Sequence, residues 1–205
     1  RTLISEYLNE ISSMKKISTL YLKNPNDLKT VIDEINPENK WVVDGDGIPT
    51  RKFDGTACAV FSGELYKRYD VKKGRQVPMN AIPCQDPDLI TGHHPHWVKC
   101  DRNNPDDKYH FEAFDKLCRE IPPDFIDGTY ELCGEKINGN REKISGHKLI
   151  PHGDEILHDC IDFSFEGLKK YLSNHELDIE GIVFHHKKDD RMCKIRKSDF
   201  NIKRI

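Results

Sequence analysis

The sequence predicts an α+β fold in which antiparallel sheets carry the functional residues and helices lie outside them. Short segments alternate apolar with polar residues between glycines or charges, which is typical of half-buried strands. Two other segments space their apolar residues as amphipathic helices do. Of the 205 residues, 36% are hydrophobic, which is enough for an ordinary core, and no repeat or linker is evident. We therefore expect a single domain over residues 1–205.

The strands are expected in four places. TACAVFSGELYKRYDV, residues 56–71, alternates on both sides of Ser62-Gly63 and predicts a hairpin. The runs TYELCG, EGIVFHH and MCKIRK are short, rich in apolar residues and bounded by glycine or charge, so each predicts a strand.

The two helices are expected at residues 27–35 and 165–175. DLKTVIDEI and FEGLKKYLSNH each place apolar residues on one face at helical spacing. The residues concerned are Leu28, Val31, Ile32 and Ile35 in the first segment, and Leu168, Tyr171 and Leu172 in the second.

Cysteine usage and hydropathy predict an intracellular protein. The seven cysteines never reach the C-x-x-C spacing of zinc or redox sites, so free thiols in a cytoplasmic or other reducing compartment are expected. No apolar run approaches the roughly 18 residues of a membrane span, and the N-terminus lacks the order of a secretory signal. The histidines of GHHPHW (93, 94 and 96) are interrupted by Pro95 and are interpreted as a surface loop.

Charge points to a polyanionic ligand only locally. The formal net charge of -3 argues against a protein that coats nucleic acid. The runs KRYDVKKGR (67–75) and KIRKSDFNIKRI (194–205) nevertheless each hold five basic residues against one aspartate. Such a run is commonly a solvated face, but it also suits a polyphosphate or a nucleic-acid backbone. Lys72 and Lys73 of the first run are the expected contacts with such a backbone.

Lys52 in RKFDGTACAVF is the candidate nucleophile. On the simplest interpretation it is a surface residue before the hairpin signal Asp54-Gly55. Alternatively, a tight turn at a strand edge aims the lysine into a pocket, where lost solvation and nearby cations favour the neutral amine. A neutral amine can attack the α-phosphate of a nucleotide and form a covalent intermediate.

Later segments offer the other groups that this chemistry requires. Alternation puts Glu131 of TYELCG opposite a core-facing pair. Glu180 enters an apolar strand beside Gly181, where a backbone can approach a ligand closely. In MCKIRK, Lys194 and Arg196 share one face and can grip phosphate.

The order of these motifs resembles the covalent nucleotidyltransferase superfamily of ligases and capping enzymes. KFDG, YEL, EGIV and KIR follow one another as motifs I to V do in that superfamily, over most of the chain. TYELCGEKINGN, KLIPHG, GHHPHWVK and the Pro-Thr before the lysine are similar to the RNA ligase 1 family of ATP-dependent 5′-phosphate, 3′-hydroxyl RNA ligases. The segments 138–140 and 151–153 have no chemistry of their own that the sequence reveals.

The resemblance implies a nucleotidyltransferase (ATP-grasp-like) domain that seals RNA in three steps, in RNA repair. Lys52 takes AMP from ATP, AMP passes to an RNA 5′-phosphate, and a 3′-hydroxyl then displaces AMP. Magnesium is implied, with manganese as an alternative ion, and Glu131 and Glu180 match positions that bind the metal or the ribose. The nucleotide-binding positions that the resemblance implies are Arg51, Asp54, Gly55, Arg68, Glu131, Ile182, Val183, Lys194 and Arg196.

The pattern also departs from that of relatives, which leaves alternatives open. Arg196 stands where many have a second lysine, which preserves the charge. The chain ends nine residues later, so no oligonucleotide-binding-fold domain is expected, which disfavours DNA ligases and capping enzymes. A GTP-using capping guanylyltransferase and a catalytically silent RNA-binding module of the same fold remain the alternatives. No protein partner is identified.

Overall fold

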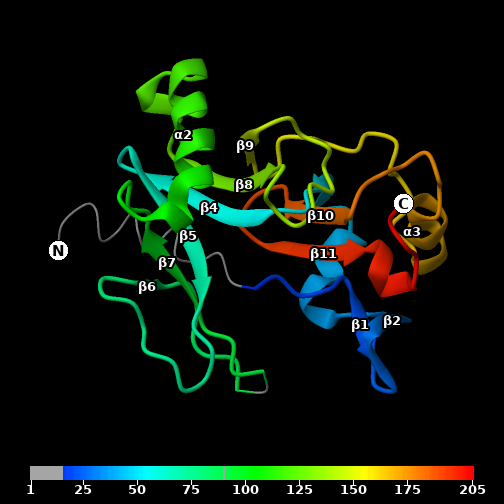
Figure 1. Ribbon diagram of the computed structural model, residues 1–205. Coiled ribbons are helices and arrows are strands. Elements are labelled where there is room, and N and C mark those ends of the chain that lie inside the picture. Colours follow the sequence, from blue (N-terminus) through cyan, green and yellow to red (C-terminus); the bar gives the residue numbers. More distant parts are fainter. Residues whose placement is uncertain (1–15, 90) are drawn as a thin grey trace. The chain divides into compact units, whose positions relative to one another are not determined.

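The computed structural model describes residues 16–89 and 91–205 and contains antiparallel sheets with few helices, as an α+β class requires (Figure 1). The chain divides into two compact units. Unit 1 comprises Asp54–His152 together with Lys16, and unit 2 comprises Ile17–Phe53 and Gly153–Ile205. The expectation of one functional domain over residues 1–205 stays a prediction.

Unit 1 is built on a six-stranded antiparallel sheet in the order β6-β7-β5-β4-β8-β9. The strands are β4 (Thr56–Phe61), β5 (Glu64–Asp70), β6 (Ile82–Pro83), β7 (Pro95–Lys99), β8 (Gly128–Gly134) and β9 (His147–Pro151). Strands β4 and β5 form the predicted hairpin around Ser62-Gly63, where both residues have positive φ. The prediction of that hairpin is confirmed.

Helix α2 (Lys108–Glu120) covers one face of this sheet (Figure 1). The 3-10 turn η2 (Pro105–Asp107) leads into it, and η3 (Pro123–Phe125) follows it. Its residues Ala113, Phe114 and Leu117 pack with inward-facing strand residues such as Leu132. The other face carries a smaller cluster around Trp97. Alternation along the strands therefore separates a face that packs on the helix from a second face that carries polar side chains.

Unit 2 contains a three-stranded antiparallel sheet in the order β11-β10-β3. The strands are β3 (Gly47–Lys52), β10 (Gly181–His186) and β11 (Met192–Arg196). Helix α3 (Phe165–Leu172) is capped by the preceding Ser164, whose side chain accepts a hydrogen bond from the Gly167 N–H. It buries Leu168 and Leu172 in the core of the unit, which confirms the second predicted helix. The 3-10 turns η1 (Pro37–Val42) and η4 (Lys197–Phe200) complete the unit with the β1-β2 hairpin.

The prediction of a helix at residues 27–35 is wrong. DLKTVIDEI forms strand β2 (Asp27–Ile35), which pairs with β1 (Tyr21–Asn24) in an irregular antiparallel hairpin. Leu28 is 72% exposed, whereas Val31 is buried. The β-branched residues of this segment favour extended backbone, and pairing with β1 overrides its helical spacing.

Candidate functional site

Lys52, the candidate nucleophile, is the last residue of β3 in unit 2. In the strand register it lies opposite Gly181 of β10, which lies opposite Arg196 of β11. Residues directly opposite one another in an antiparallel pair share a face of the sheet. Lys52 and Arg196 therefore lie in one row across the sheet, separated by a glycine that has no side chain.

Gly181 also explains how closely these strands pack. A Cβ at this position would come within 3.0 Å of the backbone of Ile195 and Arg196, closer than real Cβ atoms approach backbone. The close approach that the sequence led us to expect for a ligand is therefore made by strand β11. Because Gly181 has no side chain, β11 can pack closely against β10 in the row that contains Lys52 and Arg196.

Glu180, directly before β10, pairs with the lysine. The Lys52 Nζ donates a hydrogen bond to the Glu180 Oε2 at 2.8 Å, and both side chains are about a quarter exposed, at 22% and 24%. A lysine side chain has a lone pair to offer an electrophile only in its neutral form. Lys52 can therefore act as a nucleophile only after its amine loses a proton, and the Glu180 carboxylate is positioned to orient that amine.

The next row on the same face consists of Thr50, Val183 and Lys194. The Thr50 hydroxyl donates to the Val183 carbonyl at 2.8 Å and fixes the join between β3 and β10. Ile182 lies on the opposite face, fully buried in the core of unit 2. Of Ile182 and Val183, both implied by the resemblance as nucleotide-binding positions, only Val183 faces the same side as Lys52.

Arg196 is held rigidly by a buried carboxylate. Its guanidinium donates two hydrogen bonds to Asp199, at 3.2 and 3.0 Å, and the Lys23 Nζ donates to the same carboxylate at 2.6 Å. Burial alone would lower the pKa of Arg196, but the hydrogen bonds and the charges of Asp199 and Glu180 outweigh it and raise the pKa. Arg196 thus carries a permanent positive charge in the same row as Lys52, and Asp199 orients its guanidinium.

Arg51 lies beside the lysine but faces differently, because adjacent residues of a strand point to opposite sides. Its guanidinium lies 4.8 Å from the centre of the Phe53 ring and 3.5 Å from the Glu155 carboxylate. Its backbone N–H donates to the Glu155 carbonyl at 2.9 Å. The backbone N–H of Arg51, a nucleotide-binding position that the resemblance implies, is therefore engaged within unit 2.

In unit 1, Glu131 and Arg68 lie on the sheet face that α2 does not cover. Glu131 of β8 pairs with Ala57 of β4, and Arg68 of β5 pairs with Trp97 of β7, which belongs to the cluster on that face. The Glu131 Oε2 lies 2.7 Å from the His152 Nε2, so the residue after β9 fixes the carboxylate. Sequence reasoning found no role for His152, because β8 and β9 become neighbours only through the fold.

The Asp54-Gly55 turn is also held within unit 1. Asn138 and Glu142, from the segment between β8 and β9, make hydrogen bonds to it. The role of Asn138-Gly139-Asn140, which the sequence did not reveal, is thus at least a structural one.

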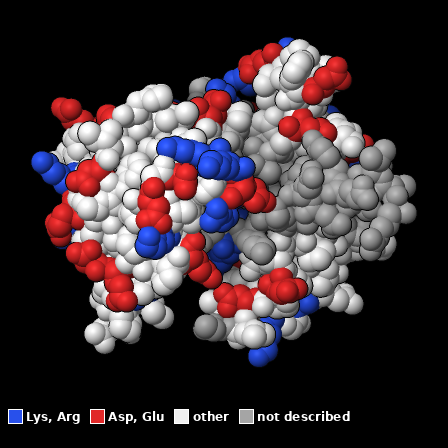
Figure 2. All heavy atoms as spheres, turned by 180° about the vertical axis from the view of Figure 1, so that it is seen from behind, with Lys and Arg blue, Asp and Glu red and all other residues white. Residues whose placement is uncertain are grey.

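The two basic runs differ in the structure. In the first, Lys72 and Lys73 are exposed, whereas Lys67 pairs with the buried Asp107. In the second, Lys197 is buried and donates to the Leu177 carbonyl, and Arg204 pairs with Asp178 at 2.8 Å. The second run is therefore largely an internal network and not a solvated face. Figure 2 shows lysine and arginine interspersed with aspartate and glutamate on one face of the molecule.

The histidine segment is only partly a loop. His93 and His94 precede β7, where Asp70 contacts the His93 ring and accepts from the His94 N–H at 2.9 Å. His96 is buried inside β7, so the expectation of a surface loop is wrong for it. In the part of the chain that the structure describes, no three histidine, cysteine, aspartate or glutamate residues are grouped to hold a metal. A cation on Glu180 or Glu131 would take its remaining ligands from substrate and water.

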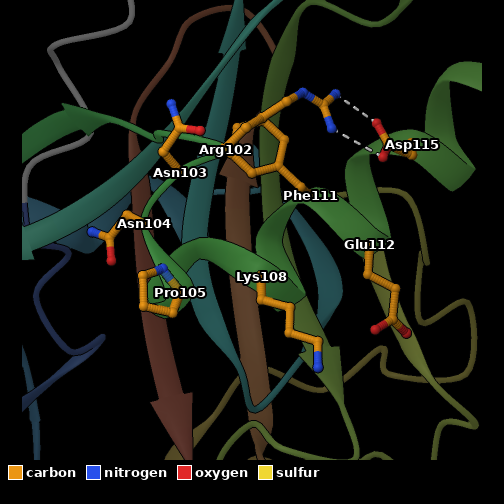
Figure 3. A pocket seen from close by; sticks show the side chains of 8 residues that line it. All are labelled: Arg102, Asn103, Asn104, Pro105, Lys108, Phe111, Glu112 and Asp115. Carbon is orange, nitrogen blue, oxygen red and sulfur yellow. Dashed lines mark hydrogen bonds and ion pairs between the residues drawn. The ribbon is translucent and has the colours of Figure 1, made fainter.

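A hollow outside the expected site lies at the start of α2. Its volume is about 430 Å³, and its lining residues are Arg102, Asn103, Asn104, Pro105, Lys108, Phe111, Glu112 and Asp115 (Figure 3). The Arg102 guanidinium points to Asp115, with hydrogen bonds of 3.1 and 2.7 Å, and lies 4.3 Å from the centre of the Phe111 ring. The arginine is thus already engaged by a carboxylate and a ring.

All seven cysteines are free, and burial raises the pKa of most of them, to about 11 for Cys84 despite the opposing charge of Arg68. The prediction of free thiols is confirmed.

Among the described residues, no helix is both long and apolar enough to cross a membrane.

Comparison with known proteins adds no identification. No protein-family model matches the chain, and no curated protein sequence matches it significantly.

Proposed function

We propose that this chain is an ATP-dependent RNA ligase that joins 5′-phosphate and 3′-hydroxyl ends through a lysyl-AMP intermediate, with RNA repair as its role. One observation carries the proposal: Lys52 ends a strand in one row with the fixed cation Arg196, and a carboxylate holds its amine. A nucleophile, a cation for phosphate and an acidic group beside them are what nucleotidyl transfer to lysine requires.

Each proposed step exchanges one bond at phosphorus for another. The Lys52 Nζ, after loss of a proton, attacks the α-phosphorus; the N–P bond forms, the bond to the bridging oxygen breaks, and pyrophosphate leaves. An RNA 5′-phosphate oxygen then attacks the same phosphorus, breaks the N–P bond and returns the lysine. Finally a 3′-hydroxyl attacks the 5′-phosphate of the adenylylated RNA, forms the phosphodiester and expels AMP.

The chain's own groups supply charge neutralisation and orientation. Arg196 offers its permanent charge to the α-phosphate, with Lys194 in the adjacent row of the same face. Val183 offers an apolar surface on that face, where a base can pack. Glu180 in unit 2 and Glu131 in unit 1 are each a proposed carboxylate for a magnesium ion or a ribose, and a bound magnesium ion would add to the neutralisation of phosphate charge. Arg68, Asp54 and Gly55 are proposed contacts of the nucleotide or the RNA end.

Labelling of the protein tests the proposal directly. The chain is incubated with α-labelled ATP or, in parallel, GTP, and is then resolved under denaturing conditions. We expect label from ATP in the wild type and none in Lys52→Arg, because arginine stays protonated and cannot attack. Lys40→Arg, at an exposed lysine paired with Asp44, serves as the matched control and should label normally.

Each of the other possible labelling results would contradict one part of the proposed function. Label from GTP alone would make the chain a guanylyltransferase, and no label from either nucleotide would leave an RNA-binding module. Normal labelling of Lys52→Arg would show that another residue is the nucleophile.

A further inference from the structure

Side chains of the segment between β8 and β9 make hydrogen bonds to the Asp54-Gly55 turn. The Asn138 side-chain amide donates to the Asp54 Oδ1 at 3.1 Å and to the Gly55 carbonyl at 2.8 Å. The Asp54 N–H donates to the Glu142 Oε1 at 2.8 Å. One amide group therefore ties together a side chain and a backbone carbonyl of the turn that follows Lys52 in the sequence.

Strand β8 packs closely against the same turn. A Cβ on Gly55 would come within 3.0 Å of the Leu132 carbonyl, so only glycine fits there. The Cys133 thiol contacts the Asp54 carbonyl at 3.9 Å. The turn is thus held between β8 and Asn138, and loss of either contact would let it move.

The segment between β8 and β9 is also ordered by its own backbone conformation and hydrogen bonds. Asn138 and Asn140 adopt the left-handed backbone conformation, with φ of 47° and 51°, which asparagine tolerates better than most residues. Among the described residues, the Asn140 side chain bonds within the segment: it accepts from the Ile144 N–H and donates to the Ile144 carbonyl, at 3.0 Å each.

Helix α2 anchors the base of the segment through His147. The Lys136 N–H donates to the His147 Nε2 at 3.2 Å, and the His147 Nδ1 lies 3.0 Å from a Glu112 carboxylate oxygen. The His147 ring also stacks on Tyr109, with the ring centres 4.3 Å apart. Figure 3 shows Glu112 on α2, and its carboxylate thus links the helix to the base of the segment.

We infer that Asn138 is a positioning residue for nucleotidyl transfer, acting through Asp54 and Gly55. The inference rests on the proposed function, which assigns that turn to the nucleotide. Asn138 does not touch the reacting atoms; it fixes the carboxylate and the backbone of the turn in one geometry. Its loss should slow the chemical step more than it weakens ATP binding, because misplacement of about 1 Å can cost about a hundredfold in rate.

Asn138→Gly tests this role with Asn140→Gly as its matched control. Glycine adopts the left-handed backbone without strain, and both variants add the same backbone freedom, so their difference reports the two asparagine side chains. We expect the rate of lysyl-AMP formation at saturating ATP to fall about tenfold to a hundredfold in Asn138→Gly, while the ATP concentration for half-maximal rate changes by less than about threefold. Asn140→Gly, whose side chain does not contact the turn, should lose much less.

Hydrogen exchange gives a second measurement that needs no activity. The amides of residues 54–56 should exchange faster in Asn138→Gly than in the wild type or in Asn140→Gly. Equal rate losses in the two variants, or a normal rate in Asn138→Gly, would overturn the inference. A wild-type chain that forms no adduct would overturn the proposed function instead, and exchange would then still decide whether Asn138 holds the turn.

Discussion

Asp199 is the residue that fixes Arg196, and its charge should also stabilise the fold. It is fully buried and accepts hydrogen bonds from Lys23 and from the Arg196 side chain and N–H. Burial alone would raise the pKa of Asp199, but the hydrogen bonds from Arg196 and Lys23 outweigh it and lower the pKa. A carboxyl whose pKa is lower in the folded state stabilises it when ionised.

We therefore expect Asp199→Asn to lower the free energy of unfolding by about 3–5 kcal/mol at neutral pH, since it leaves two cations without their buried partner. The wild-type advantage should be complete above the unfolded pKa of about 3.9 and should shrink as the pH falls through the lower folded pKa. Urea unfolding between neutral and acidic pH measures this. Asp124→Asn, at an exposed aspartate, should change stability by less than about 0.5 kcal/mol. A difference between wild type and Asp199→Asn that did not shrink in acid would contradict the assignment.

Single residues also show what the sequence could and could not predict. Strand alternation alone put Lys194 and Arg196 on one face and placed Glu131 opposite the core, because side-chain direction in a strand is local. The pairing of Lys23 with Asp199 spans 176 positions and that of Asn138 with Asp54 spans 84. Only the fold brings such residues together, so no local pattern could have revealed them.

At the scale of elements, the hidden amphipathic helix α2 is the main difference from expectation. Its buried residues Ala113, Phe114 and Leu117 lie among charged ones, which masked the helical spacing. Start signals were present for the turn η2 that leads into it: the Asn104 side chain accepts from the Asp106 N–H, and Pro105 is the first residue of η2. The N-cap of α2 itself, Asp107, makes no side-chain capping hydrogen bond. The wrongly predicted helix at 27–35 shows the converse, since its spacing was helical but its composition favoured a strand.

Truncation of a leucine to alanine should lower the free energy of unfolding by different amounts in α2 and in β2. Leu117 is 5% exposed and packs α2 onto the sheet, so Leu117→Ala should lower the free energy of unfolding by about 2–5 kcal/mol. Leu28 in β2 is 72% exposed, so Leu28→Ala should cost less than about 0.5 kcal/mol. Urea titrations of both variants measure the difference. Similar losses would mean that Leu28 is buried as a helical interpretation of its segment requires.

At the scale of the whole molecule, charge limits how the proposed ligase could bind RNA. The formal net charge is -3, so the protein as a whole does not attract a polyanion. The second basic run is mostly occupied by internal partners, whereas Lys72 and Lys73 between β5 and β6 are exposed. If the proposed ligase binds RNA electrostatically, these lysines and Arg75 are the exposed cations of the first run that it can use.

We expect Lys72→Gln combined with Lys73→Gln to leave lysyl-AMP formation unchanged but to weaken RNA binding and sealing. The affinity falls as salt rises, and each lost phosphate contact on single-stranded RNA makes the slope of log affinity against log salt less steep by about 0.7. The loss of two contacts should therefore reduce the steepness by about 1.4. The slope is measured by RNA binding across a salt series, beside the rate of adduct formation. The matched control is Lys169→Gln with Lys170→Gln, an exposed adjacent pair in the last turn of α3. An unchanged slope in the Lys72, Lys73 variant, or an equal change in the control, would assign these lysines to an ordinary solvated surface, and the RNA would have to bind elsewhere.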